Sequence, residues 1–375
     1  MAALRRILKT LTWGAAGLLV TAFLFGYAAP YLPPPRFWWA NLLAIFMPPL
    51  GGAVGMLALG LIGHGMYRRR WGRVVVAGGL LLLLALRFGP RLAAWSRVSP
   101  SVGDLQVMTL NVPPTFGADS PGSLAALVGT KEPNLLAFQE SRFWTGDPAS
   151  SPSLTRVSLS LRPLLSDSVG YAPPRQLPAN TEIQQPVLGR PVPESLSVHP
   201  LPPRGKTDAR SRYTRTQLTW RGRPAALYNV HLHTVGAARP REVTRGQVFS
   251  LSRWRTFFQT YREGALRRAQ QARLIRRAIE REDRPVIVVG DFNSTPHQWA
   301  YRHIARGLQS AAGRRIQGWA ATFPAGRPLV HIDHVLASPD WRIVAAEIPG
   351  PKDGRAISDH RPVFARLRWK TDSLQ

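Results

Sequence analysis

PVIVVGDFNSTP, residues 285–296, has four β-branched residues in a row, followed by glycine, polar residues and proline. This pattern is typical of a buried strand that runs into a loop. Asp291 and Asn293 are two residues apart, so strand alternation predicts that both side chains leave the strand end on the same side. A carboxylate and an amide in this arrangement can orient a water and hold a phosphoryl oxygen. An Asx-rich turn that only closes the strand has the same local pattern.

Apolar residues followed by polar ones occur in other parts of the chain as well. These segments are MTLN at 108–111, LLAFQE at 135–140, YNVHL at 228–232, HIDH at 331–334 and SDH at 358–360. Each places a group that binds metals or protons at the expected end of a strand or just after it. A single segment of this kind is weak evidence for a site, because exposed carboxylates and structural histidines are common beside strands.

Taken in order, the six segments resemble the endonuclease/exonuclease/phosphatase superfamily of metal-dependent phosphoesterases, over residues 102–369. The specific part of the pattern is GDFN followed by a terminal SDH, in the correct order with the Asn, Glu and Asn-x-His segments. The resemblance implies a four-layer α/β sandwich, in which two mixed β-sheets pack face to face with helices outside. Strand ends of both sheets are then expected to converge on one edge.

The resemblance also implies a metal site. Glu140 is expected to bind Mg²⁺ or Mn²⁺ through its carboxylate, a hard oxygen ligand. Asn111 is expected to support the same ion through its amide oxygen or a water, and Asp359 to join the set of ligands. The sequence has no His-x-x-x-His helix or similar spacing, which argues against a zinc site.

Five further residues are expected to carry the reaction. Asp291 polarises the attacking water or accepts its proton, and Asn293 fixes the geometry. His360 contacts the scissile phosphate, while Asp333 holds the imidazole of His360 in one tautomer. His231 is expected to assist the phosphate or the leaving group, as in the deoxyribonuclease and sphingomyelinase branches. The family's mid-chain active-site residue cannot be assigned within residues 145–212.

Three apolar runs precede the segments described above. Residues 11–29 and 37–66 carry no charge, and residues 74–86 form a third run that must extend toward Trp71 and Phe88 to span a bilayer. The pair Pro48-Pro49 is expected to kink the second run. A signal peptide would explain only the first run. We therefore predict a membrane anchor over residues 1–97 with about three transmembrane helices, and a catalytic domain over residues 98–375.

Positive charges predict the orientation of these spans. Arg5, Arg6 and Lys9 precede the first span, and RRRWGR at 68–73 separates the second from the third. Because such residues favour the cytoplasmic side, the catalytic domain is expected outside the cytoplasm, on a bacterial inner membrane. Arg87 and Arg91 on the outer side weaken this argument.

The remaining elements are expected as follows. Strands are predicted at 105–110, 135–138, 329–336 and 362–367, a hairpin at 213–220 and 225–232, and helices at 124–128 and 265–281. Residues 145–212 are rich in Pro, Ser and Arg and are predicted to form loops and short strands at a substrate-facing rim.

Composition narrows the functional classes. The net charge of +28 favours anionic partners such as phospholipid headgroups or nucleic acid, although an arginine-rich codon bias has the same effect. With no cysteine, the chain has no disulfides and no thiolate metal ligands. We expect a membrane-anchored phosphodiesterase or phosphatase acting on a lipid or small-molecule phosphate. The alternatives are an extracytoplasmic nuclease acting on DNA or RNA, and an inactive membrane protein that binds anionic ligands. The lipid bilayer is the expected partner, and no protein partner is predicted.

Overall fold

The computed structural model describes most of the chain. It covers residues 2–92, 99–113, 121–141, 143–144, 156–157, 161, 164, 169–172, 175, 182–202, 212–234, 250–316, 320–350 and 357–370.

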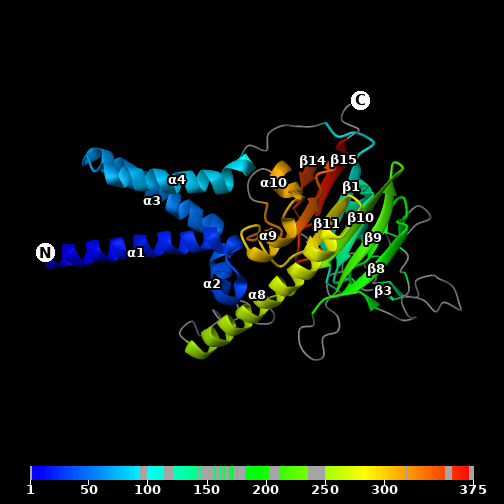
Figure 1. Ribbon diagram of the computed structural model, residues 1–375, viewed down its shortest axis with the longest axis horizontal. Coiled ribbons are helices and arrows are strands. Elements are labelled where there is room, and N and C mark those ends of the chain that lie inside the picture. Colours follow the sequence, from blue (N-terminus) through cyan, green and yellow to red (C-terminus); the bar gives the residue numbers. More distant parts are fainter. Residues whose placement is uncertain are drawn as a thin grey trace.

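The N-terminal quarter of the chain is helical. Its elements are α1 (Ala2–Ala28), a 3₁₀ turn (Ala29–Tyr31), α2 (Pro34–Ile45), α3 (Met47–Tyr67) and α4 (Trp71–Leu92). Three stretches within it are long and apolar enough to cross a membrane: Ala3–Tyr31, Met47–Tyr67 and Trp71–Gly89. In Figure 1, α1, α3 and α4 extend away from the β-sheets on one side of the molecule.

The second apolar run differs from the prediction, because residues 37–66 form parts of two helices. The chain turns at Phe46, and Pro48 and Pro49 lie in the first turn of α3. Proline is tolerated there because the first N–H groups of a helix have no intrahelical partner. The prolines therefore begin a new helix instead of kinking a long one. Helix α2 has 12 residues, too few to span a bilayer, which takes about 20.

Two six-stranded mixed sheets form the centre of the rest of the molecule. The first has the order β14-β15-β1-β2-β7-β5, and the second has the order β12-β13-β11-β10-β9-β8. Strands of the first sheet are β1 (Leu105–Asn111), β2 (Leu135–Gln139), β5 (Gly170–Tyr171), β7 (Val187–Gly189), β14 (Trp341–Glu347) and β15 (Val363–Trp369). Strands of the second are β8 (Ser195–Pro200), β9 (Arg212–Trp220), β10 (Arg223–His231), β11 (Val286–Asp291), β12 (Gln309–Ser310) and β13 (Asp333–Ala337). A small third sheet contains β3 (Phe143–Trp144), β4 (Arg156–Val157) and β6 (Glu182–Ile183).

Apolar side chains from both large sheets form one core between them. Val107 and Ala137 of the first sheet share it with Leu227 and Val289 of the second. Helix α6 (Pro121–Lys131) covers the outer face of the first sheet. Helices α8 (Leu251–Glu280) and α9 (Trp299–Ala305) cover the second, and a short α10 (Ala311–Arg315) follows. The four-layer α/β sandwich expected from the sequence is confirmed (Figure 1).

Several element boundaries differ from the prediction. Helix α8 begins at Leu251 instead of Ala265, and β13 begins at Asp333 instead of residue 329. The additional turns of α8 pack against α2, where the ring of Trp38 lies 6.4 Å from that of Phe258 and 6.3 Å from that of Tyr261. This contact joins residues more than two hundred positions apart, so the local sequence does not reveal it.

Candidate active site

Strand pairing in the second sheet brings three of the predicted residues together. Asp291, the last residue of β11, is paired with His231 of the parallel strand β10 and with Asp333 of the antiparallel strand β13. Asp333 was expected at the end of a strand, but it is the first residue of β13. Because β13 runs antiparallel to β11, its first residue lies at the edge where β11 ends.

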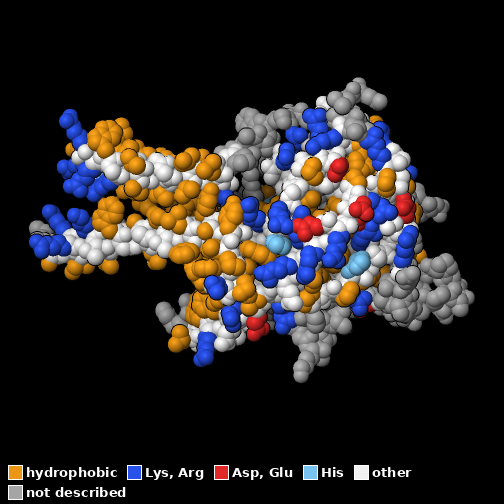
Figure 2. Space-filling model, in the orientation of Figure 1, with side chains coloured by type: hydrophobic (Ala, Val, Ile, Leu, Met, Phe, Trp, Pro, Cys, Tyr) orange, Lys and Arg blue, Asp and Glu red, His pale blue; other side chains and the backbone are white. Residues whose placement is uncertain are grey.

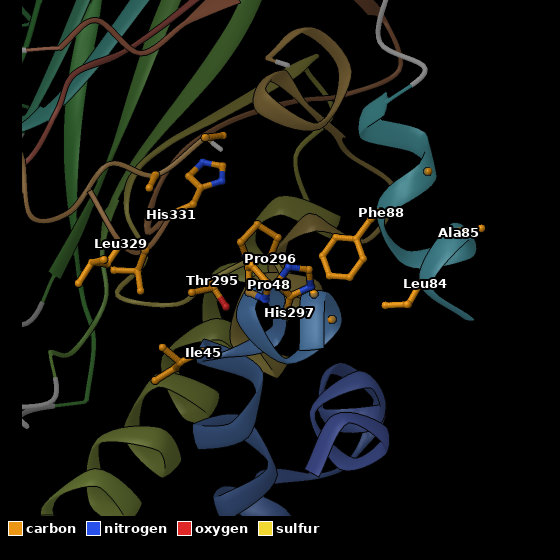
Figure 3. Close-up of a pocket in the computed structure, with 16 residues that line it drawn as sticks. Ile45, Pro48, Leu84, Ala85, Phe88, Thr295, Pro296, His297, Leu329 and His331 are labelled. Atoms are coloured by element: carbon orange, nitrogen blue, oxygen red, sulfur yellow. The ribbon is translucent and has the colours of Figure 1, made fainter. Parts of the chain in front are cut away.

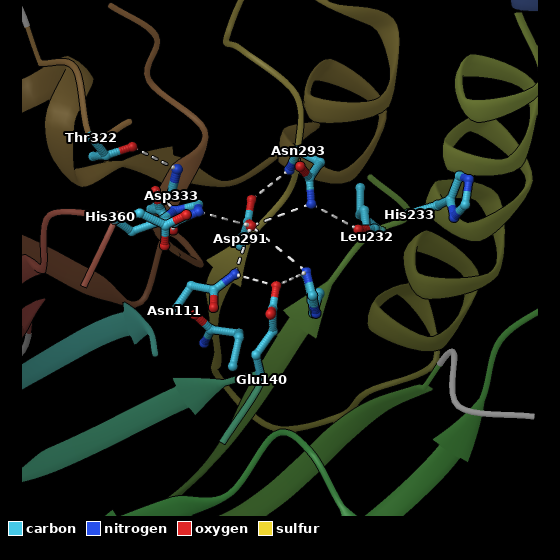
Figure 4. Close-up of polar contacts among 12 residues, drawn as sticks. Asn111, Glu140, Leu232, His233, Asp291, Asn293, Thr322, Asp333 and His360 are labelled. Carbon is cyan, nitrogen blue, oxygen red and sulfur yellow. Dashed lines mark hydrogen bonds and ion pairs between the residues drawn. The ribbon is translucent and has the colours of Figure 1, made fainter. Parts of the chain in front are cut away.

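The first sheet contributes to the same edge. Strands β1 and β2 are parallel, so Asn111 at the end of β1 lies beside Glu140, which follows β2 in a left-handed conformation with φ of 58°. The side-chain amide of Asn111 donates to Oε1 of Glu140 at 3.0 Å and to Oδ2 of Asp291 at 3.1 Å. Asn111 thus joins polar groups of both sheets (Figure 4).

Asp291 and Asn293 do meet, but strand alternation is not the reason. The strand ends at Asp291, and Asn293 takes a left-handed conformation with φ of 45°. Its backbone N–H donates to Oδ1 of Asp291 at 2.8 Å, which closes an Asx turn. Its side-chain amide donates to Oδ2 of Asp291 at 3.3 Å and to the carbonyl of Leu232 at 3.0 Å. The turn therefore locks the Asp291 carboxylate in position.

His360 and Asp333 form a buried pair. Nδ1 of His360 donates to the Asp333 carboxylate, at 2.9 Å to Oδ2 and 3.1 Å to Oδ1. Nε2 of His360 lies 3.9 Å from Oδ2 of Asp291. Burial by itself lowers the pKa of His360, but the carboxylates of Asp333 and Asp291 outweigh it and raise the pKa to about 10. The imidazole is therefore positively charged at neutral pH.

Asp291 is the residue that these contacts share. Burial raises its pKa, and the neighbouring Asp333 raises it further, whereas His360 and His231 counteract the rise. Ligand atoms of Asp291, Asp333 and His360 all lie within 4.8 Å of one another. A carboxylate with a raised pKa beside a charged imidazole is suited to accept a proton from a bound water.

The other side of Asp291 is more open. Nε2 of His231 lies 3.6 Å from Oε1 of Glu140 and 3.7 Å from Oδ2 of Asp291. The Glu140 side chain is 38% exposed, compared with 2% for Asp291. A cation and a substrate can therefore approach the cluster past Glu140.

The donor set fits a divalent cation. Since Nδ2 of Asn111 is used by two carboxylates, its Oδ1 points elsewhere, and within the described part of the chain this buried oxygen has no hydrogen-bond partner. Carboxylate and amide oxygens are the ligands that Mg²⁺ and similar hard cations take. Asp359 is half-buried, and Ser358 donates to its Oδ1 at 3.4 Å. Its role as a ligand stays a prediction.

Two further histidines, His233 and His334, lie near the site and make other contacts. His233 follows strand β10, which ends at His231. The carbonyl of His233 accepts a hydrogen bond from Arg268, and its ring is directed away from Asp291 in Figure 4. His334 is buried, with Nε2 2.9 Å from the carbonyl oxygen of Ser294.

Sequence reasoning missed three supporting residues. The hydroxyl oxygen of Thr322 accepts the backbone N–H groups of Ile332 and Asp333 at 3.2 Å each, and the ring of Phe323 packs 4.8 Å from that of His360. Arg268 is buried on α8 and interacts electrostatically with Asp291. Arg268 follows Ala265 by three residues and precedes Ala272 by four, and both alanines are buried, so this helical spacing could have indicated that Arg268 is buried too. Thr322 and Phe323 lie outside regular structure, where no periodic signal exists.

Comparisons with known proteins concern the family and the fold of the chain. The model of the Endonuclease/Exonuclease/phosphatase family matches residues 110–360. A solved endonuclease/exonuclease/phosphatase structure from Beutenbergia cavernae DSM 12333 is 19% identical, with a TM-score of 0.50, covering 71% of this chain and 72% of that one. A second, from Bacteroides vulgatus, is 17% identical, with a TM-score of 0.49, covering 71% of this chain and 99% of that one. A search of curated proteins found no match. At these identities the structural likeness concerns the fold.

Proposed function

Because this chain belongs to the endonuclease/exonuclease/phosphatase family, we propose that it is a membrane-anchored phosphoesterase dependent on Mg²⁺ or Mn²⁺. Members of the family are hydrolases that act on phosphate esters, and the chain is a hydrolase of this kind. The observation that carries the proposal is the convergence of Asn111, Glu140, His231, Asp291 and Asp333 with His360 at one edge of both sheets.

His360 is proposed to bind the phosphoryl group. Its charged imidazole is held at Nδ1 by Asp333, so the N–H at Nε2 remains available toward the open side of Asp291. A fixed positive donor at this point stabilises the negative charge that develops on the phosphoryl oxygens. Asp333 acts by holding the ring in one orientation.

Asp291 is proposed to orient the attacking water and accept its proton. The raised pKa of this carboxyl makes it a better base than an ordinary aspartate, and Asn293 prevents it from rotating. His231 lies between Glu140 and Asp291 and is proposed to donate to the phosphate or to the leaving oxygen.

Glu140 and Oδ1 of Asn111 are the proposed ligands of the divalent cation, with Asp359 as a further candidate. When bound, such a cation neutralises phosphoryl charge and lowers the pKa of water. The half-exposed position of Glu140 supports this role, since a cation can reach its carboxylate without opening the core.

The direct test is a phosphodiesterase assay of the full-length protein on bis-p-nitrophenyl phosphate. We expect turnover with Mg²⁺ or Mn²⁺, loss of turnover with EDTA, and recovery when the metal is restored. A protein that binds this diester but never hydrolyses it with any divalent metal would contradict the proposal and support the inactive binding protein.

Residues 1–97 are proposed to anchor the chain in a bacterial inner membrane, with residues 98–375 as an extracytoplasmic catalytic domain. The N-terminus and the α3–α4 turn lie at the end of the helices away from the sheets, and basic side chains gather at that end (Figures 1 and 2). A position of the N-terminus and the α3–α4 turn on the cytoplasmic side agrees with the positive-inside rule. Arg87 at the other end is engaged with the catalytic half, where its Nε donates to Nδ1 of His297 at 3.0 Å.

Reporter fusions test this orientation. A reporter that is active only outside the cytoplasm is expected to be active after Trp95 and inactive after Arg69. The reverse pattern would make the catalytic domain cytoplasmic and leave the proposed chemistry unaffected.

A further inference from the structure

A cavity of about 480 Å³ lies where the apolar helices meet the catalytic half of the chain. Pro48 and Gly52 of α3 and Leu84 and Phe88 of α4 line it from the side of the helices. Residues 295–297, 320–321 and 329–331 line it from the other side (Figure 3). Its volume falls within the range of small-molecule binding sites.

The lining of the cavity is mainly apolar, and its walls leave room for a ligand. Helices α3 and α4 belong to stretches able to cross a membrane, and at most 22% of either of these two stretches is buried in the protein. A Cβ atom built on Gly52 or Gly89 would meet no described atom within 4 Å. Gly52 and Gly89 therefore keep part of the cavity wall free of side chains. Because little of these apolar helices is buried in the protein, we expect lipid to surround them.

Thr295 adds a polar group to this apolar lining. Its side chain is buried, and among the described residues its Oγ1 has no hydrogen-bond partner. The backbone N–H of Thr295 is bound separately by Oε1 of Gln298 at 2.7 Å. A buried hydroxyl without a partner is unfavourable, so an acceptor oxygen of a ligand would relieve the cost once the Thr295 side chain turns its Oγ1 toward the cavity.

Three lining segments continue directly into the candidate active site. Residues 295–297 follow Asn293, and residues 329–331 precede Asp333. Residues 320–321 precede Thr322 and Phe323, which support Asp333 and His360 respectively. A molecule in the cavity therefore contacts the same segments that carry the proposed catalytic groups.

We propose that the cavity binds an acyl chain of the substrate, which is a membrane lipid with a phosphate ester, and that Thr295 donates a hydrogen bond to its ester carbonyl. The bilayer around α3 and α4 supplies such chains at high local concentration. This inference rests on the proposed phosphoesterase function and names the substrate class.

The first test narrows the cavity with Gly52→Leu in the full-length protein in nanodiscs. The control is Gly60→Leu, on the same helix, where a Cβ also meets no described atom within 4 Å and which does not line the cavity. Dipalmitoyl and dibutyryl forms of phosphatidic acid, phosphatidylglycerol and phosphatidylinositol phosphate are compared with bis-p-nitrophenyl phosphate. Gly52→Leu is expected to lower kcat/KM about tenfold for the dipalmitoyl lipids and to leave it unchanged for the dibutyryl lipids and the diester. A tenfold loss is roughly the effect of removing one or two buried methylene contacts.

Thr295→Val provides a second variant, because it removes the hydroxyl and keeps the shape. It is expected to raise KM severalfold for the ester-linked lipid and to leave hydrolysis of bis-p-nitrophenyl phosphate unchanged. A phosphatidylglycerol with a photoactivatable palmitoyl chain is expected to cross-link to residues that line the cavity, less so in Gly52→Leu than in Gly60→Leu.

The outcomes separate the two proposals. Failure to hydrolyse bis-p-nitrophenyl phosphate and every phosphate lipid of the panel would contradict the phosphoesterase function, whereas cross-linking would still report on the cavity. Cross-linking without any change in lipid hydrolysis would identify a structural lipid and overturn the substrate proposal. Hydrolysis of plasmid DNA together with no lipid hydrolysis would overturn it in favour of the nuclease.

Discussion

Residues 291–299 have two ends in different surroundings. At one end, the carboxylate of Asp291 is buried among Asp333, His360 and Asn111, so charge dominates the contacts. At the other, neutral groups are bound to helix α2. The backbone N–H of Trp299 donates to Oδ1 of Asn41 at 2.9 Å, and Gln298 donates to the carbonyl of Asn41 at 3.0 Å.

The difference shows two uses of buried polar groups in one segment. The charged end orients the groups that are proposed to react, and its contacts shift pKa values. The neutral end fixes the position of the half that contains the sheets against α2, and Tyr261 of α8 accepts a further hydrogen bond from Gln298 at 3.1 Å. The N-terminal helices are therefore packed against the rest of the folded unit through α2.

The largest expected effect comes from the charged end. His360→Ala and Glu140→Gln should each lower kcat on bis-p-nitrophenyl phosphate by at least about a hundredfold, the scale of general acid–base groups. Glu140→Gln should also raise the metal concentration needed for half-maximal activity, whereas His360→Ala should leave it nearly unchanged. Wild-type rates in either folded variant would refute the assignment of the site.

Asp333→Asn should shift the pH dependence of turnover. The pKa of His360 is about 10 in the folded protein, above about 6.5 in an unfolded chain, so its contribution to folding stability is full below about pH 6.5 and is lost as pH rises through about 10. The imidazole loses its charge only near that upper pH. Without the Asp333 charge, only Asp291 and Asp359 oppose the effect of burial, so the pKa of His360 falls. The alkaline limb of the kcat profile should therefore move to lower pH, and Asp359→Asn should move it less. An unchanged limb in Asp333→Asn would contradict the pairing.

Asn41→Ala tests the neutral end. Loss of the hydrogen bond to Trp299 leaves a partly buried N–H without its partner and should cost about 1 kcal/mol of unfolding free energy. We expect a lower Tm in detergent and a fall in kcat of less than about tenfold, because no proposed catalytic group is removed. The exposed Arg36 on the same helix provides the control Arg36→Ala, whose Tm should not change. A collapse of kcat without a change in Tm would mean that the neutral end takes part in catalysis.

Salt is expected to have the smallest effect. A site for one phosphate group should lose affinity only slightly with ionic strength, whereas a groove that follows DNA loses it with a logarithmic slope of about −0.9 per phosphate neutralised. The measurement is KM against salt concentration for bis-p-nitrophenyl phosphate and for plasmid DNA. A steep slope with efficient DNA cleavage would indicate that the surface arginines form a nucleic-acid interface.

Much of the fold was predictable because strand and loop signals are local. Residues 286–291 form a strand as expected, and so does the hairpin of β9 and β10, whose turn residues Arg221 and Gly222 both have positive φ, as such a turn requires. The strand β14 and the first half of α8 were not predicted. Their positions depend on neighbours that are distant in sequence, β15 for the strand and α2 for the helix.

The sequence by itself determined which residue types are available for phosphoester chemistry and in what order they follow strands. It also determined the presence of three apolar stretches, because length and hydropathy are properties of the chain alone. Only the tertiary structure decided that Asp333 meets Asp291 from the start of an antiparallel strand, and that Asn293 reaches Asp291 through a turn. The pKa values of Asp291 and His360, and the cavity beside Thr295, were decided in the same way. Charge coupling, burial and cavities depend on distances between segments that are far apart in the chain, and those distances exist only after folding.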